Sequence, residues 1–172
     1  MRILVTNDDG IHGPGLDVLE TIARTLSDDV WVVAPDEERS GAGHSLTLSN
    51  PLRYRKLGER RYEVEGTPTD CVIMAVRKIM PALPDLILSG VNRGANIADD
   101  VTYSGTIAAA MEGTALGIKS IAFSQVTGIY DNGESFAVAL AHGPAVAKKL
   151  AAMTFGPGVL MNVNFPDCRP DE

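Results

Sequence analysis

The sequence predicts an α/β protein: a Rossmann-like three-layer domain with a mainly parallel sheet, helices on both faces and a small exposed β-hairpin. Short apolar runs alternate along the chain with stretches whose apolar residues repeat at helical spacing, the pattern of parallel strands joined by helical crossovers. The strand-like runs are apolar without alternation, as expected when helices cover both faces of a sheet. The chain has no internal repeat and no obvious linker, so we expect one domain over residues 1–172.

The first half of the chain provides two strands, a helix and the hairpin. Ile3–Thr6 is an unbroken apolar strand, and Gly15–Leu26 follows with apolar residues every three or four positions, which predicts a helix packed on the sheet. Val30–Ala34 is rich in β-branched residues and is stopped by Pro35. The segment 53–64 is polar and loosely alternating, so we expect an exposed hairpin there.

The second half begins with a well-marked helix start. Thr67 can cap a helix, Pro68 suits its first position, and Asp70 is favourable near the positive end of the helix dipole. This helix should end at about Met80, before Pro81. The remaining expected elements are strands at 86–89, 120–124 and 159–164 and helices at 106–116 and 136–152.

Composition excludes several classes of function. Over 172 residues the net charge is −7, whereas nucleic-acid polymers and anionic membranes require a basic surface. The two cysteines, Cys71 and Cys168, are too few for a disulfide framework and lack zinc-site spacing. The N-terminus has no apolar stretch long enough for a signal peptide, and no segment approaches the ~20 apolar residues of a membrane span. We therefore expect a cytoplasmic protein.

Polar residues follow three of the predicted strands. Asp8 and Asp9 come directly after the first strand, Ser40 lies in the loop after the second, and Asn92 follows the strand at 86–89. The carboxyl ends of parallel strands open on one edge of the sheet, where ligands bind. Two adjacent carboxylates repel each other, and a hard cation that prefers oxygen ligands would compensate them. The alternatives are structural: a solvated Asx turn at Asp8-Asp9, a simple turn at Ser40, and a left-handed backbone at Asn92.

The segment Ser104-Gly105-Thr106 opens a predicted helix and could bind an anion. Backbone N–H groups and the helix dipole favour a phosphate at such a position, although Ser104 could serve only as an N-cap. No P-loop lysine pattern is present, which argues against nucleoside triphosphate hydrolysis of the Walker type. His12, His44 and the acidic pair Asp99-Asp100 are better explained as incidental loop residues than as catalytic or metal-binding groups.

These segments resemble the motifs of the stationary-phase survival protein (SurE) family of metal-dependent phosphatases. Their order and spacing match over nearly the whole chain, to the segment ending at Pro166. The matching segments are Asn7-Asp8-Asp9-Gly10, Ala34-Pro35 through Arg39-Ser40-Gly41, Gly66-Thr67-Pro68-Thr69-Asp70-Cys71, Ser89-Gly90-Val91-Asn92 with Gly94 and Asn96, and Tyr103-Ser104-Gly105-Thr106 through Gly113.

The resemblance implies a Rossmann-like fold and hydrolysis of nucleoside 5′- and 3′-monophosphates, and some members of the family also shorten polyphosphate. It implies one divalent ion, Mg²⁺ or Mn²⁺, and assigns residues to two sets. Asp8, Asp9, Ser40 and Asn92 would bind the metal, with Asp8 and Asp9 also catalytic, and Asn96, Ser104, Gly105 and Thr106 would bind the substrate phosphate.

The resemblance also bears on assembly. Family members continue past the strand ending at Asn164 with an extended hairpin and a swapped element that build a homodimer or homotetramer. We therefore expect this chain to lack the dimerisation segment.

Three other functions are open to the same residues. A nucleotide-binding or sensing protein could keep the pocket and have lost turnover through the shortened C-terminus. Aspartyl-phosphate chemistry of the haloacid-dehalogenase type would need an acid two residues after Asp8, where this chain has Gly10. A dinucleotide oxidoreductase would need a glycine fingerprint after the first strand, where this chain has Asn7-Asp8-Asp9-Gly10.

Overall fold

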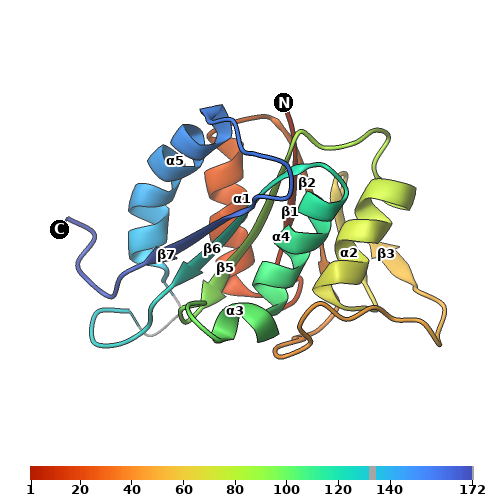
Figure 1. Ribbon diagram of the computed structural model, residues 1–172, viewed down its shortest axis with the longest axis horizontal. Helices are drawn as coiled ribbons and strands as arrows, with labels where there is room; N and C mark the ends of the chain where they lie inside the picture. The colour runs from red at the N-terminus through yellow and green to blue at the C-terminus, as the bar shows by residue number, and fades with distance from the viewer. Residues whose placement is uncertain (132–134, 172) are drawn as a thin grey trace.

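The computed structural model describes residues 1–131 and 135–171 and contains a seven-stranded sheet in the order β3-β4-β2-β1-β5-β6-β7 (Figure 1). All neighbouring strands pair in parallel except β3 and β4, which form an antiparallel hairpin. The predicted α/β fold with a mainly parallel sheet is confirmed. The strands are β1 (Arg2–Thr6), β2 (Asp29–Pro35), β3 (Tyr54–Lys56), β4 (Arg61–Val64), β5 (Leu86–Arg93), β6 (Lys119–Gln125) and β7 (Met161–Phe165).

Helices cover both faces of the sheet, as predicted. One face carries α1 and α5 and the other carries α2 and α4, an arrangement that Figure 1 shows from the side. The helices are α1 (Pro14–Arg24), α2 (Pro68–Met74), α3 (Asp100–Tyr103), α4 (Gly105–Ala115) and α5 (Ala137–Ala152), and a π-helical segment η1 (Ala75–Ile79) continues α2.

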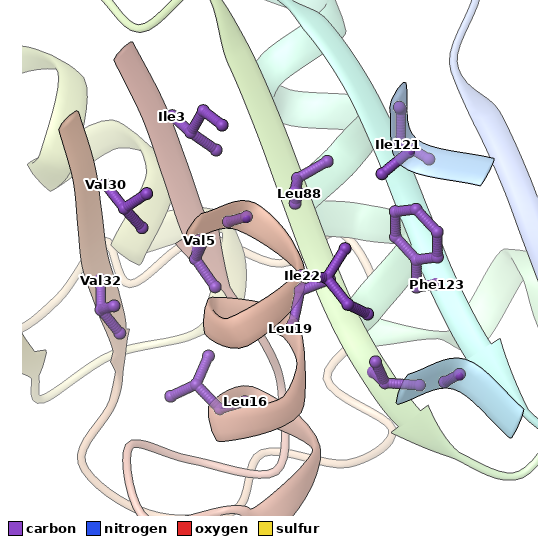
Figure 2. Packing of buried hydrophobic residues seen from close by; sticks show 14 of the residues in the cluster. Ile3, Val5, Leu16, Leu19, Ile22, Val30, Val32, Leu88, Ile121 and Phe123 are labelled. Atoms are coloured by element: carbon purple, nitrogen blue, oxygen red, sulfur yellow. The ribbon is translucent and has the colours of Figure 1, made fainter. Parts of the chain in front are cut away.

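The strands divide their side chains between two apolar clusters. Ile3 and Val5 of β1 face α1 and α5, whereas Leu4 between them faces α2 and α4. Figure 2 shows the first cluster, in which Leu16, Leu19 and Ile22 of α1 lie over residues from β1, β2, β5 and β6. Burying each such side chain contributes roughly 1.5–3 kcal/mol, and both faces of the central strands contribute. This two-sided burial explains why the strands lack polar alternation.

The strand β5 is longer than the sequence predicted. It continues through a bulge, so that Ser89 pairs with Ala122 but Asn92 pairs with Ser124. Gly90 makes the bulge possible: its φ is +125°, and a Cβ there would lie 2.1 Å from the carbonyl oxygen of Phe123. The consequence for the site is that Asn92 lies on the end of a strand, in a hydrogen-bonded ladder, and not in a loop.

The hairpin and the short helices also differ in detail from the prediction. The outer strand β3 is exposed as expected, but β4 pairs in parallel with β2, so the hairpin extends the main sheet. The start of α2 is a complete capping box: the Thr67 side chain accepts from the Asp70 backbone, and the Asp70 carboxylate accepts from the Thr67 N–H. Asp99 and Asp100, expected in a turn, begin the one-turn helix α3 and are both exposed.

Candidate active site

Asp8 and Asp9 lie at the end of β1 but in different surroundings. The Asp8 side chain points into the protein: the residue is 4% exposed, and its carboxylate accepts a hydrogen bond from the buried Thr106 hydroxyl. A Cβ on Gly105 would lie 2.8 Å from the Cβ of Asp8, so only glycine lets the start of α4 come this close. Asp9 is half-buried and faces an open cavity.

This cavity, which we call the metal-site cavity, has a volume of about 210 Å³ and is lined by Asp9, Ser40 and Asn92. These three residues follow or end β1, β2 and β5, three neighbouring strands of the parallel sheet. The structure therefore brings together three of the four predicted metal ligands, and the fourth, Asp8, directly precedes Asp9 in the sequence. The remaining lining residues are Gly13, Pro14, Glu38, Arg93 and Phe136.

None of these five residues was singled out from the sequence, and Glu38, Arg93 and Phe136 contribute side chains of functional interest. Glu38 accepts a 2.7 Å hydrogen bond from the Ser40 hydroxyl and adds a third carboxylate to the site. Phe136 is buried at the start of α5 with φ = +48°, an unusual backbone for a residue with a side chain. The charge of Arg93 opposes that of Asp9. Glu38 and Arg93 had a signal, because each lies in the same segment as a predicted ligand, Ser40 and Asn92 respectively.

Burial and negative charge raise the pKa of both carboxyl groups. For Asp9, burial is the largest cause, followed by the charges of Asp8 and Glu38, and together they raise the pKa to about 6 despite the opposing charge of Arg93. Burial also raises the pKa of Asp8, although the hydrogen bonds from Thr106 lower it. Without a cation, the site is an energetically unfavourable place for two carboxylates.

Backbone hydrogen bonds connect the loop that carries Ser40 to the end of β1. The N–H of Arg39 donates to the carbonyl of Asp8 at 2.8 Å, and the N–H of Ile11 donates to the carbonyl of Pro35 at 2.7 Å. On the opposite side, a Cβ on Gly15 would lie 2.0 Å from the Val91 carbonyl oxygen, so α1 packs directly on the end of β5. The relative positions of the three strand ends are thus set by main-chain packing.

Three of the predicted phosphate-binding residues, Ser104, Gly105 and Thr106, lie at the start of α4, whereas Asn96 contacts the ends of β6 and β7. Most of the four side chains already have partners. The Ser104 hydroxyl accepts from the Ile107 N–H at 3.1 Å, so its N-cap role is confirmed. The Thr106 hydroxyl donates a hydrogen bond to the Asp8 carboxylate. Asn96 is buried and donates to the Ser124 hydroxyl at 2.8 Å, while its backbone N–H donates to Asn164. The left-handed backbone considered for Asn92 occurs at Gly90 and Gly94 instead.

The residues present fit a hard divalent cation. The four candidates offer carboxylate, hydroxyl and amide oxygens, which suit Mg²⁺ or Mn²⁺ better than zinc. The Oδ1 atom of Asn7, immediately before Asp8, is buried without a hydrogen-bond partner in the described structure, so the strand end carries unsatisfied negative potential. Within residues 1–131 and 135–171 no three His, Cys, Asp or Glu side chains cluster as metal ligands, so a site here depends on Ser40 and Asn92.

The other residues weighed from the sequence do not line the metal-site cavity. His12 is exposed, and His44 pairs with Glu112 of α4 at 3.0 Å. That pair links the loop after β2 to α4.

In the described part of the chain, no helix combines the length and the apolar character needed to cross a membrane.

Comparison with known proteins agrees with this architecture. A family model described as Survival protein SurE matches residues 3–172. The whole chain is similar to the 5′-nucleotidase SurE of Methylorubrum extorquens (strain PA1), at 61% identity over 68% of that protein. It is also similar to the protein of that name from Mesorhizobium japonicum, at 62% identity over 69% of its length. Among solved structures, the SurE protein from Aquifex aeolicus matches with a TM-score of 0.90 and 41% identity, over 100% of this chain and 68% of that one.

Proposed function

Because this chain belongs to the survival protein SurE family, we propose that it is a divalent-metal-dependent phosphomonoesterase that hydrolyses nucleoside 5′-monophosphates to nucleoside and phosphate. The proposal extends to nucleoside 3′-monophosphates and to polyphosphate. The similar proteins from Methylorubrum and Mesorhizobium carry the name 5′-nucleotidase, which supports the enzyme class. As for assembly, we propose a homodimer or homotetramer.

The observation that supports this function best is the meeting of Asp9, Ser40 and Asn92 at one cavity beside the buried Asp8. A carboxylate pair of this kind gains most from a Mg²⁺ or Mn²⁺ ion, which Asp8, Asp9, Ser40 and Asn92 would hold. When bound, such an ion supplies charge neutralisation at phosphoryl oxygens and lowers the pKa of water. The remaining steps fall to the residues of the chain itself.

The two aspartates differ in what they can do. The Asp8 carboxylate accepts a hydrogen bond from Thr106, and its side chain packs closely against Gly105. We therefore assign to Asp8 the role of holding the metal ion in a fixed geometry. Asp9 faces the cavity, where a substrate and a water molecule have access, so we assign proton acceptance to Asp9. The N–H groups at the start of α4 would donate to the phosphoryl oxygens, a preorganised arrangement that favours negative charge. Asn96 would complete the phosphate site.

The test is phosphate release from nucleoside 5′-monophosphates by the purified chain with Mg²⁺ or Mn²⁺, compared with the Asp8→Asn variant. We expect the variant to lose activity roughly 100-fold, since it replaces one of the two charged carboxylates that would hold the cation with a neutral amide. Asp99→Asn is the matched control, because Asp99 is exposed and its side chain makes no capping bond. Unchanged release by Asp8→Asn would refute the proposal.

The same assay separates the enzyme from a nucleotide sensor. Calorimetry with a nucleoside monophosphate would show binding in either case, whereas only the enzyme releases phosphate. Binding without release under every divalent ion tested would favour the sensor.

A further inference from the structure

A second cavity lies behind the loop that carries Ser40. Its volume is about 360 Å³, within the range of small-molecule sites, and none of the catalytic or metal-binding candidates lines it. Its walls come from the loop after β2, the hairpin and the segment that precedes α2. The lining residues are Arg39, Thr47, Asn50, Pro51, Arg53, Glu65, Gly66 and Thr67.

The loop after β2 separates this cavity from the metal-site cavity. The side chains of Glu38 and Ser40 line the metal-site cavity, whereas Arg39 between them lines the second one. The backbone N–H of Arg39 meanwhile donates to the Asp8 carbonyl. Arg39 therefore lines the second cavity while its backbone N–H contacts the end of β1.

The second cavity contains cationic groups in an otherwise acidic protein. Arg39 and Arg53 line it against a single acid, Glu65, in a chain whose net charge is −7. The Arg53–Glu65 pair is 3.5 Å apart and more than half exposed on both sides, so it is weak and easily displaced. Arg39 pairs through Nη2 with Asp36 and Glu37, but its Nε–H is buried without a partner in the described structure.

The other polar groups that line the cavity indicate which kind of anion would bind there. The hydroxyl protons of Thr47 and Thr67 are already donated to the Asp70 carboxylate and the Ser45 carbonyl, so Asn50 and the two arginines are the donors that face a ligand. Among the described lining residues there is no aromatic ring to stack on a nucleobase. Two guanidinium groups beside an amide donor are suited to a phosphate group. We propose that this cavity is a second phosphate-group site, formed by Arg39 and Arg53 and separate from the reaction centre.

Its effect on turnover rests on the proposed nucleotidase function. A phosphate group held by Arg39 and Arg53 fixes the loop after β2 against the hairpin, and with it Ser40 and the contact to Asp8. The phosphate group has two sources: a further phosphate of a polyphosphorylated substrate, or a free phosphate compound acting as an effector. Both require the same two arginines.

The first experiment measures binding without turnover. Tripolyphosphate is titrated into the purified chain in the presence of a chelator, and the affinity is compared with that of Arg53→Gln. We expect about a tenfold loss, the size of one charge-assisted hydrogen bond. Arg60→Gln is the matched control, since it removes the same charge from an exposed pair with Asp29 and should bind as the wild type does. Equal affinity of Arg53→Gln and wild type would overturn the proposal.

The second experiment identifies the source. If the group belongs to the substrate, Arg53→Gln raises KM for tripolyphosphate hydrolysis about tenfold and leaves nucleoside monophosphate hydrolysis unchanged. If it belongs to an effector, Arg53→Gln abolishes the change that added tripolyphosphate or inorganic phosphate causes in monophosphate hydrolysis. The binding experiment does not depend on catalysis, so failure of the nucleotidase proposal would leave its result interpretable.

Discussion

At neutral pH, Asp9 in the folded, metal-free chain is ionised to a smaller extent than an aspartate in water. Its pKa of about 6 in the folded state exceeds the ordinary value of 3.8, so the folded chain binds this proton more tightly than the unfolded chain does. The resulting contribution to stability is fully present below pH 3.8 and is lost as the pH rises through 6. At pH 8 the ionised Asp9 therefore destabilises the metal-free fold.

We predict that Asp9→Asn raises the melting temperature of the metal-free protein at pH 8. The gain should be on the order of 1 kcal/mol, after allowance for the partial exposure of the side chain, and should shrink as the pH is lowered toward 4. Thermal unfolding with a chelator measures it. Excess Mn²⁺ should stabilise the wild type but not the variant. A lower melting temperature for the variant at pH 8 would contradict this account.

Close backbone approach is what links the elements at the site. The start of α4 reaches Asp8 because residue 105 has no side chain, and α1 reaches β5 because residue 15 has none. In an α/β protein the ligand site lies between such elements, so a small displacement of one helix changes every distance in it.

We predict that Gly105→Ala separates α4 from β1. The added Cβ would lie 2.8 Å from the Asp8 Cβ and 3.1 Å from Pro68, so the helix must move away. Overpacking of this kind costs roughly 1–3 kcal/mol of stability. Because the helix start and Asp8 shift together, we expect phosphate release to fall roughly 10- to 100-fold.

Gly58→Ala provides the control for that measurement. Residue 58 lies in the hairpin, where a Cβ would meet only the Arg61 Cβ, at an ordinary contact distance of 3.6 Å. Its activity and melting temperature should match those of the wild type. Equal loss of activity in both variants would show that the effect does not arise at Asp8.

At the scale of the whole molecule, the two cysteines differ in how accessible their thiols are in the folded state. Cys71 is fully buried in the cluster beneath α2, and burial, together with the charges of Asp70 and Asp36, raises the pKa of its thiol well above the usual range. Cys168 is half-buried near the end of the chain. Since the thiolate is the reactive form, the two thiols should differ strongly in reactivity.

We predict that a thiol reagent at pH 8 modifies Cys168 in the folded protein and reaches Cys71 only when the chain unfolds globally. The denaturant dependence of Cys71 labelling in a Cys168→Ser variant should therefore follow the unfolding transition seen by circular dichroism. Labelling of Cys71 well below that transition would show that α2 opens independently.

The sequence was sufficient for the features that depend on local pattern. The apolar runs, the caps at Thr67 and Ser104, and the rule that parallel strand ends share an edge predicted the sheet and the grouping of Asp9, Ser40 and Asn92. The pairing of β4 with β2 and the bulge at Gly90 depend on contacts between distant segments. No local pattern encodes such contacts, so they required the structure.

The position of β1 in the sheet has a consequence for how the protein is made. This strand pairs with β2, which is complete at Pro35, and with β5, which is complete only at Arg93. At synthesis rates of about 5–20 residues per second, the nascent chain spends several seconds with one edge of this buried strand uncovered. Asp8 and Asp9 are therefore synthesised well before Asn92, and the proposed metal site cannot form until β5, which ends at Arg93, has been translated.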